Sequence, residues 1–263
     1  MVSGRVDVRL EGYVVLVTGG AKGIGRGIAE AFLETGATVV VCGRNPPDSL
    51  PHAGGRTAVF MACDVRDAEA VGRLFAEIER TQGRLDVLVN NAGGTPSMDA
   101  ATASPRLTEK IIQLNLVGPL HCAQAANRLM QKQATGGSIV NIASVAGGLR
   151  PSPTTAAYGA AKAGLLSATE SLAMEWGPKV RVNAVIAGLV ATEHSGDHYG
   201  GVEGVRRIGE MFPLKRMAEP ADVAAACLYL ASPLAAYVSG AQLAVHGGGE
   251  RPVFLYLADK GAP

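Results

Sequence analysis

Tyr158 and Lys162 stand four residues apart in a segment, 156–176, that we predict to be helical. Helical positions i and i+4 share one face, so the two side chains should lie close enough to interact. A phenol with an ordinary pKa of about 10 is a poor base near neutrality, but an adjacent ammonium favours the phenolate. The pair can therefore transfer a proton, although this spacing alone more often marks an ordinary half-buried tyrosine on an alanine-rich helix.

Ser144 adds a hydroxyl fourteen residues before Tyr158, just after the β-branched run SIVNI at 138–142. Ligands of parallel sheets bind beyond the carboxyl ends of the strands, so we expect Ser144 to orient a substrate oxygen there. Asn115 lies in KIIQLNLVGPL and on its own would be taken for a packing residue of an apolar helix.

A Gly-rich turn, TGGAKGIG at 18–25, follows the first β-branched run. Glycines let the backbone approach a pyrophosphate, whose charge is favoured at a helix N-terminus. The spacing is G-x-x-x-G-x-G rather than the common G-x-G-x-x-G, and alone it could be only a turn. The residues of the turn that we expect to bind a dinucleotide are Gly19, Lys22, Gly23, Ile24 and Gly25.

Alternating strands and helices must position these residues. Alternation favours a parallel sheet with helices on both faces, because right-handed crossovers between parallel strands need a covering helix. The predicted fold class is α/β, a Rossmann-like doubly wound parallel sheet of about seven strands, with residues 1–263 as a single domain. We predict strands at 13–17, 38–42, 57–62, 86–89, 138–142, 180–185 and 241–245, and helices at 23–35, 67–82, 105–132, 156–176 and 220–231.

Two helix ends have clear signals. Ser104 before Pro105 predicts an N-cap with proline at the first helical position, and Gly177-Pro178 predicts a C-cap. Pro119 has no N–H, so it leaves the carbonyl of Asn115 without its helical donor and should bend the helix. A water held by that carbonyl and Lys162 could relay protons from Tyr158, unless the proline serves packing alone.

The composition indicates a small-molecule partner. Lys and Arg number 24 against 23 acids, so the formal charge of +1 gives no reason to propose nucleic acid or a membrane surface. The charged N-terminus lacks the apolar core of a secretory signal, and the apolar run 223–238 is too short to span a bilayer, so we expect a cytoplasmic protein. The cysteines are predicted to be buried thiols, and neither they nor the histidines have metal-ligand spacing or an expected catalytic role: Cys42, Cys63, Cys122, Cys227, His121, His194, His198 and His246.

Taken in order, the Gly-rich turn, Asp64 after the third strand, NNAG at 90–93, Ser144 and Tyr158-x-x-x-Lys162 resemble the short-chain dehydrogenase/reductase family over almost the whole chain. The resemblance implies that Tyr158 is the general acid/base, that Lys162 also holds the nicotinamide ribose, and that Asn115 completes a catalytic tetrad. It departs from the family where Ala187-Gly188 replaces Pro-Gly, which should loosen that loop. The further cofactor contacts that it implies are Asp64, Val65, Asn91, Ala92, Gly93, Gly188, Val190 and Thr192.

The cofactor preference is predicted from the end of the second strand. NAD enzymes of this fold have an acid there that binds the ribose 2′-hydroxyl, whereas this chain has Gly43 followed by Arg44. Arg44 and Lys22 can bind a 2′-phosphate, unless both are ordinary solvated cations. NADP(H) is therefore expected to be preferred, with NAD(H) possible.

These features predict an oxidoreductase that interconverts a secondary alcohol and a ketone. A mainly nonpolar substrate would lie between the segment after Ser144 and a mobile lid at 189–214. One alternative is a 3-oxoacyl thioester (acyl-carrier-protein) reductase, and another is a catalytically silent nucleotide sensor.

The resemblance also implies a homotetramer, a dimer of dimers, with the C-terminal segment near an interface. The candidate carrier-docking residues are Arg128, Lys132, Lys179 and Arg181.

Overall fold

A seven-stranded parallel sheet forms the centre of the molecule in the computed structural model, which describes residues 8–193 and 195–259. The strand order is β5-β2-β1-β6-β7-β8-β9, so the direction of strand addition reverses between β1 and β6. Ligands of doubly wound sheets bind beside such a reversal, and the predicted fold class is confirmed. The strands are β1 (Val14–Thr18), β2 (Thr38–Gly43), β5 (Val59–Ala62), β6 (Val87–Asn90), β7 (Gly137–Ser144), β8 (Val180–Ala187) and β9 (Gln242–Val245).

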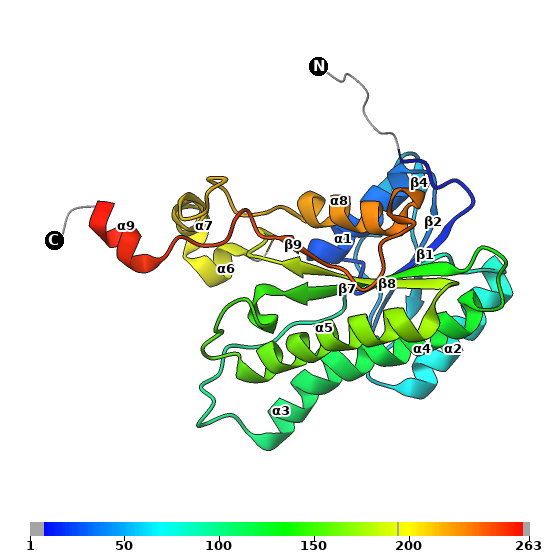
Figure 1. Cartoon of the computed structure of the whole chain (residues 1–263), viewed down its shortest axis with the longest axis horizontal. Helices are drawn as coiled ribbons and strands as arrows, with labels where there is room; N and C mark the ends of the chain where they lie inside the picture. Colours follow the sequence, from blue (N-terminus) through cyan, green and yellow to red (C-terminus); the bar gives the residue numbers. More distant parts are fainter. Residues whose placement is uncertain (1–7, 194, 260–263) are drawn as a thin grey trace, which may run out of the picture.

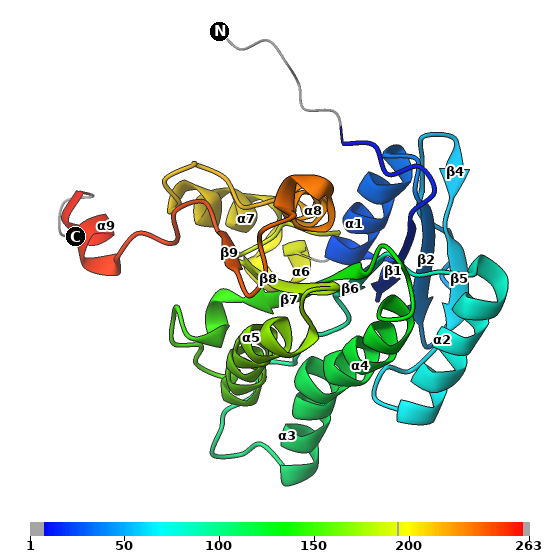
Figure 2. The same ribbon diagram turned by 45° about the vertical axis from the view of Figure 1, so that its right-hand side comes forward.

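Helices cover both faces of the sheet (Figures 1 and 2). Along β1, Val15 and Val17 face the core cluster that includes α1 and α8, whereas Val14 and Leu16 face the cluster that includes α2 and α4. Burial on both faces explains why the strands are continuous apolar runs rather than alternating ones. The helices are α1 (Gly23–Glu34), α2 (Ala68–Gln82), α3 (Pro105–Ile112), α4 (Gly118–Met130), α5 (Ala156–Trp176) and α8 (Pro220–Ala231).

The predicted helix 105–132 begins as expected but is interrupted. Ser104 is the N-cap, its Oγ accepts from the Leu107 N–H at 3.2 Å, and Pro105 is the first helical residue. A π-helical turn at Gln113–Val117 then separates α3 from α4, and the Gly118 N–H donates to the Gln113 carbonyl. A π-helical turn is one way for a helix to accommodate Pro119, which has no N–H to donate. The helix is therefore irregular next to Pro119, where the sequence predicts a bend. The water relay between Asn115 and Lys162 stays a prediction.

Other elements differ from the prediction. α5 ends at Trp176, but Gly177 is extended, with φ −61° and ψ 158°, rather than in the left-handed conformation of a typical glycine C-cap. The predicted lid contains two helices. Its many glycines did not favour a helix prediction, because glycine is a poor helix former. The elements that the sequence did not predict are β3 (His52–Ala53), β4 (Arg56–Thr57), α6 (Ser195–Tyr199), α7 (Gly201–Glu210) and α9 (Val253–Asp259).

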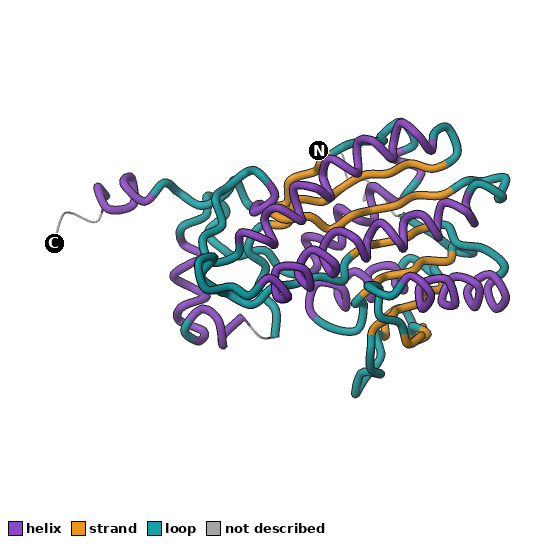
Figure 3. The backbone as a smooth tube through the Cα atoms, turned by 90° about the horizontal axis from the view of Figure 1, so that it is seen from below, coloured by secondary structure: helices purple, strands orange, loops and turns teal. Residues whose placement is uncertain are grey.

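The C-terminal helix α9 stands off the body of the molecule (Figures 1 and 3). In the described part of the chain, no helix is both long and apolar enough to cross a membrane, and no cluster of His, Cys, Asp and Glu could hold a metal ion. The four cysteines are free and buried, as predicted. Residues 1–7, His194 and the side chain of His198, to which the sequence analysis also referred, lie outside the described part.

Candidate active site

The predicted site residues gather at the carboxyl edge of the sheet. Ser144 and the predicted cofactor residues follow or end parallel strands, so the topology brings them to one edge, whereas Asn115 lies in the π-helical turn and Tyr158 and Lys162 lie on α5. Gly19 to Gly25 follow β1, Arg44 follows β2, Asp64 and Val65 follow β5, Asn91 to Gly93 follow β6, Ser144 ends β7, and Gly188, Val190 and Thr192 follow β8.

Lys162 is a buried cation one helical turn beyond Tyr158 on α5. Its side chain is 3% exposed, and its Nζ donates to the Ile142 carbonyl of β7 at 2.7 Å. The Nζ lies 5.6 Å from the centroid of the Tyr158 ring, so the two side chains share a face as their spacing predicts. Burial lowers the pKa of Lys162 to about 8, because the charged form loses its hydration.

Tyr158 is half-buried, and its phenol lies near the Ser144 hydroxyl. Burial raises the pKa of the phenol above its ordinary value, and the interaction with Ser144 offsets only part of this effect. Burial is therefore the largest influence on the phenol in this structure, and the expectation that an adjacent ammonium and a cationic nicotinamide favour the phenolate stays a prediction. Tyr158 is thus a neutral proton donor near pH 7.

The Asn115 side chain is fully buried and joins the π-helical turn to the segment after β6. Its Oδ1 accepts from the Gly94 N–H at 3.0 Å, and its Nδ2 donates to the carbonyls of Gly94 and Ile111, both at 2.9 Å. A Cβ on Gly93 would lie 2.7 Å from Asn115 Oδ1 and 3.3 Å from Lys162 Nζ. Asn115 therefore lies at the site and holds the backbone next to Lys162.

The Gly-rich turn forms a close-packed cradle with the segment after β6. Thr18 Oγ1 accepts from the N–H groups of Asn91 and Ala92 at 3.0 and 2.9 Å, and Asn91 Nδ2 donates to the Thr18 carbonyl at 2.9 Å. A Cβ on Gly25 would lie 2.4 Å from both Asn91 Nδ2 and the Gly19 carbonyl oxygen, so only glycine fits. The cradle and the N-terminus of α1 fit the diphosphate of a dinucleotide, which these residues would hold.

Cations surround the predicted adenosine end of the site. Arg44 and Lys22 are exposed, and Arg44 is one of the cations that lower the pKa of the Asp64 carboxyl. The first cause of that lowering is Arg66, whose guanidinium binds Asp64 through contacts of 2.5 to 3.1 Å. Sequence reasoning missed Arg66, although its position two residues after Asp64 was a signal. The carboxylate in this group, that of Asp64, is paired with a cation, so no unpaired negative charge there would repel a 2′-phosphate.

The loop after β8 is tied to its surroundings through the backbone. The Gly188 N–H donates to the Val245 carbonyl at 2.9 Å, and the Ala191 N–H donates to the Ala218 carbonyl at 2.7 Å. The Thr192 N–H donates to Ser195 Oγ at 2.8 Å. Glu193 follows, and its carboxylate accepts from the N–H of Gly23 at 2.9 Å. Sequence reasoning missed Glu193, because nothing local relates it to a residue 170 positions earlier.

The C-terminal segment binds both loops that were predicted to surround the substrate. Glu250 forms an ion pair with Arg150, in the loop after Ser144, at 2.5 Å. The next residue, Arg251, donates its N–H to the carbonyl of Met211, at the end of the predicted lid, at 3.0 Å. These two contacts connect segments that are distant in the sequence.

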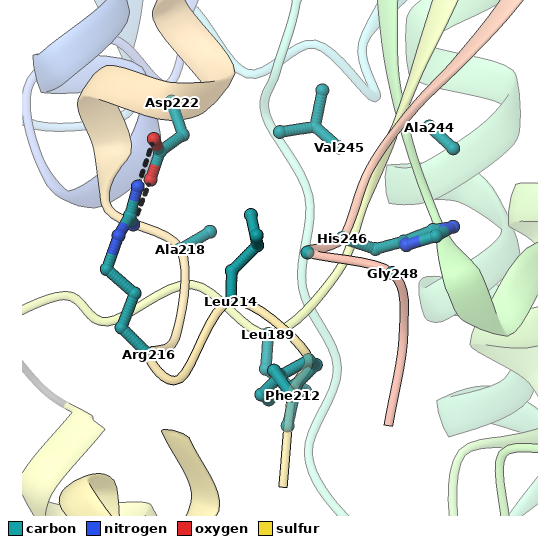
Figure 4. A pocket seen from close by; sticks show the side chains of 11 residues that line it. Leu189, Phe212, Leu214, Arg216, Ala218, Asp222, Ala244, Val245, His246 and Gly248 are labelled. Atoms are coloured by element: carbon teal, nitrogen blue, oxygen red, sulfur yellow. Dashed lines mark hydrogen bonds and ion pairs between the residues drawn. The ribbon is translucent and has the colours of Figure 1, made fainter. Parts of the chain in front are cut away.

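A cavity of about 310 Å³ lies behind the predicted lid (Figure 4). Leu189, Phe212 and Leu214 give it an apolar wall, and the ion pair between Arg216 and Asp222 stands on one side. The residues Asn115, Ser144, Tyr158 and Lys162 are not among the described residues that line it. The predicted catalytic residues therefore do not line this cavity, although residues of the predicted lid do.

Comparisons with known proteins extend over the whole site. A family model described as enoyl-(acyl carrier protein) reductase matches residues 19–250. The L-rhamnose 1-dehydrogenase (NAD(P)(+)) of Azotobacter vinelandii is 37% identical over 89% of this chain and 95% of its own. The 3-oxoacyl-[acyl-carrier-protein] reductase FabG of Aquifex aeolicus is 34% identical over 92% of this chain and 99% of its own.

The architecture agrees with these matches. The crystal structure of a protein described as a short-chain alcohol dehydrogenase, from Sinorhizobium meliloti 1021, superposes with a TM-score of 0.82 at 36% identity. The superposition covers 92% of this chain and 98% of that one. The chain therefore belongs to the short-chain dehydrogenase/reductase family and is an NAD(P)-dependent oxidoreductase.

Proposed function

We propose that the chain is an NADP(H)-preferring enzyme that interconverts a secondary alcohol and a ketone, with Tyr158 as the general acid/base. The observation that carries this proposal is the meeting of Tyr158, Ser144 and buried Lys162 at the end of β7, on the same edge as the Gly-rich cradle. The nicotinamide, when bound, donates or accepts the hydride at the substrate carbon.

Each catalytic side chain has a distinct task in this proposal. The Ser144 hydroxyl holds the substrate oxygen beside the phenol of Tyr158. In reduction the phenol O–H bond breaks and its proton joins the substrate oxygen, which leaves a phenolate. The Lys162 ammonium stabilises that anion in surroundings that exclude water, where the attraction of opposite charges is strong. In oxidation the phenolate takes the proton of the alcohol.

The variant Tyr158→Phe tests the assignment, because it removes the proton donor and keeps the ring. Its kcat with a responsive ketone should fall by about a hundredfold or more, the range expected for a lost general acid. Its affinity for the reduced cofactor, measured by fluorescence titration, should stay within a factor of about two to three of the wild-type value. Tyr229→Phe on α8, a partly exposed tyrosine, is the matched control. A variant that keeps most of its kcat would remove Tyr158 from the mechanism.

The NADP(H) preference is supported by Arg44 at the end of β2, where no acid is present. Arg44→Asp should shift the ratio of kcat/KM values from NADPH toward NADH by about ten- to a hundredfold, the effect of one lost charge-assisted contact of about 1.5 to 3 kcal/mol. Arg56→Asp on β4, also an exposed arginine, should leave the ratio unchanged. An equal ratio in all three proteins would show that Arg44 is an ordinary surface cation.

The main alternative, a 3-oxoacyl thioester reductase, has less support from the geometry. Lys132 and Lys179 lie where α4 ends and β8 begins, at the sheet edge opposite Ser144. Lys132 pairs with Glu79 at 3.3 Å, Lys179 donates to the Gln131 carbonyl at 2.7 Å, and Arg181 donates to the Leu230 carbonyl at 2.8 Å. These cations therefore do not form a docking patch beside the cleft.

A substrate screen distinguishes the candidate functions. A panel of nonpolar ketones, sugars, polyols and 3-oxoacyl thioesters, each tested with NADPH and NADH, is followed by the absorbance of the reduced nicotinamide. Turnover of simple ketones supports the proposal, and turnover of the thioester alone supports the reductase. Binding of a dinucleotide with no turnover in the panel supports the sensor.

A further inference from the structure

Glu193 joins the predicted lid, residues 189–214, to the start of α1, the helix that follows the Gly-rich turn. Its Oε1 accepts from the backbone N–H of Gly23 at 2.9 Å, across 170 residues of sequence. Gly23 is the first residue of α1 and belongs to the Gly-rich turn that would hold a diphosphate in the proposed function. A carboxylate of the protein thus lies at the position that an anionic ligand would use.

The electrostatics of this contact resemble those of a bound phosphate. The N-terminus of a helix presents unpaired N–H donors and a partial positive charge, and both favour an anion. The Glu193 carboxylate provides a negative oxygen for the Gly23 N–H, as a phosphate oxygen of the cofactor would. The two anions would also repel each other, so they cannot share this donor.

The lid is anchored just before Glu193 and forms a local turn around it, so the contact is more than a chance approach of a long side chain. The Ala191 N–H donates to the Ala218 carbonyl, and the Thr192 N–H donates to Ser195 Oγ. A Cβ on Gly23 would lie 3.6 Å from Thr192 Cγ2, which shows how closely a side chain of the lid approaches the start of the helix. The carboxylate must turn away before a diphosphate can take its place.

We propose that Glu193 is an internal competitor of the cofactor's diphosphate, and that dinucleotide binding releases the contact between the lid and the phosphate-binding turn. This inference rests on the dinucleotide site of the proposed function. The competition lowers the apparent affinity for cofactor, because only molecules without the contact can bind it.

The variants Glu193→Gln and Glu193→Ala test the competition through binding rather than turnover. Dissociation constants for NADPH and NADH are measured by fluorescence titration, and ADP and adenosine are then used as displacing ligands. Removal of the negative charge should tighten NADPH and ADP by about three- to tenfold, with the alanine variant affected at least as strongly as the glutamine variant. Adenosine, which has no diphosphate, should bind all forms equally.

Glu203→Gln is the matched control, because Glu203 is another exposed acid of the lid and pairs with Arg206 on α7. It should leave every dissociation constant unchanged. Unchanged or weaker NADPH binding by both Glu193 variants would overturn the competition, as would an equal gain for adenosine and ADP. A wild-type chain that binds neither dinucleotide would instead overturn the proposed function on which the inference rests.

Discussion

Lys162 has a charge that its surroundings disfavour, and this has two consequences of opposite sign. Its pKa is lowered to about 8 in the folded chain, from an ordinary value of 10.5, because it is almost completely buried. At pH 7 it is still mainly an ammonium ion and can stabilise the phenolate of Tyr158. The protein keeps a destabilising buried cation at the point where the proposed chemistry would use it.

The first consequence concerns activity. The ammonium is present below its pKa and lost above it, so kcat/KM for ketone reduction should fall above about pH 8, by about tenfold for each unit of pH. A pH profile between 6 and 10 with a responsive ketone measures this limb. A profile that stays flat to pH 10 would show that the ammonium is not required, or that its pKa is not lowered.

The second consequence concerns stability. Between the folded pKa of about 8 and the unfolded value of 10.5, the unfolded chain binds more protons, so this group's contribution to stability rises with pH through that window. Lys162→Met lacks the titration. The stability of the variant relative to the wild type should therefore be greatest below pH 8 and should decline above it, as measured by urea unfolding at several pH values. A relative stability that does not change with pH would contradict the buried-cation account.

At the scale of the elements, the π-helical turn brings the start of α4 against the segment after β5. A Cβ on Gly118 would lie 3.0 Å from Val65 Cγ2 and 3.1 Å from the Val65 carbonyl oxygen. Gly72, in contrast, is an exposed glycine inside α2 with nothing within 4 Å of its Cβ position. Substitution by alanine would therefore cause crowding at Gly118, whereas at Gly72 it would only add helix propensity.

We expect opposite effects from the same substitution at these positions. Gly118→Ala should destabilise the fold by about 1 to 3 kcal/mol through crowding, and it should weaken cofactor binding because Val65 moves. Gly72→Ala should stabilise the fold by about 0.5 to 1 kcal/mol. Urea unfolding and NADPH titration of both variants give the comparison. A stabilised Gly118→Ala with normal binding would show that the π-helical turn tolerates a side chain.

Elements whose signals are local in the sequence could be predicted, whereas features that depend on residues far apart in the sequence could not. Buried β-branched runs and the Ser104 cap are local signals, so the strands of the sheet and the start of α3 could be predicted. The pKa of Tyr158, the bonds of Asn115 and the contact between Glu193 and Gly23 depend on groups far away in the sequence. The residue types of the site could therefore be predicted from sequence, but their protonation and partners could not.

At the scale of the whole molecule, α9 carries apolar side chains away from the body. Val253 and Phe254 are 63% and 70% exposed, and Leu255 is also exposed. Apolar side chains gathered on a projecting segment are typical of an interaction site, and we propose that α9 takes part in the predicted homotetramer.

Light scattering coupled to size-exclusion chromatography tests this assembly. The wild type should elute with the mass of a tetramer, and the double variant Phe254→Glu, Leu255→Glu should shift to smaller species. Val202→Glu is the control, because Val202 on α7 is 89% exposed. A monomeric wild type, or equal masses for all three proteins, would contradict a role of α9 in assembly.

The two contacts of Glu250 and Arg251 also bear on how the site opens. They fasten the loop after Ser144 and the end of the predicted lid to one short segment of chain. Parts of a protein that share an anchor tend to unfold locally as one cooperative unit, with a single free energy of opening. Amide hydrogen exchange in the loop at 145–150 and in the lid at 201–211 should therefore follow the same opening event, and both walls of the site would lose their protection together when the pair between Arg150 and Glu250 breaks.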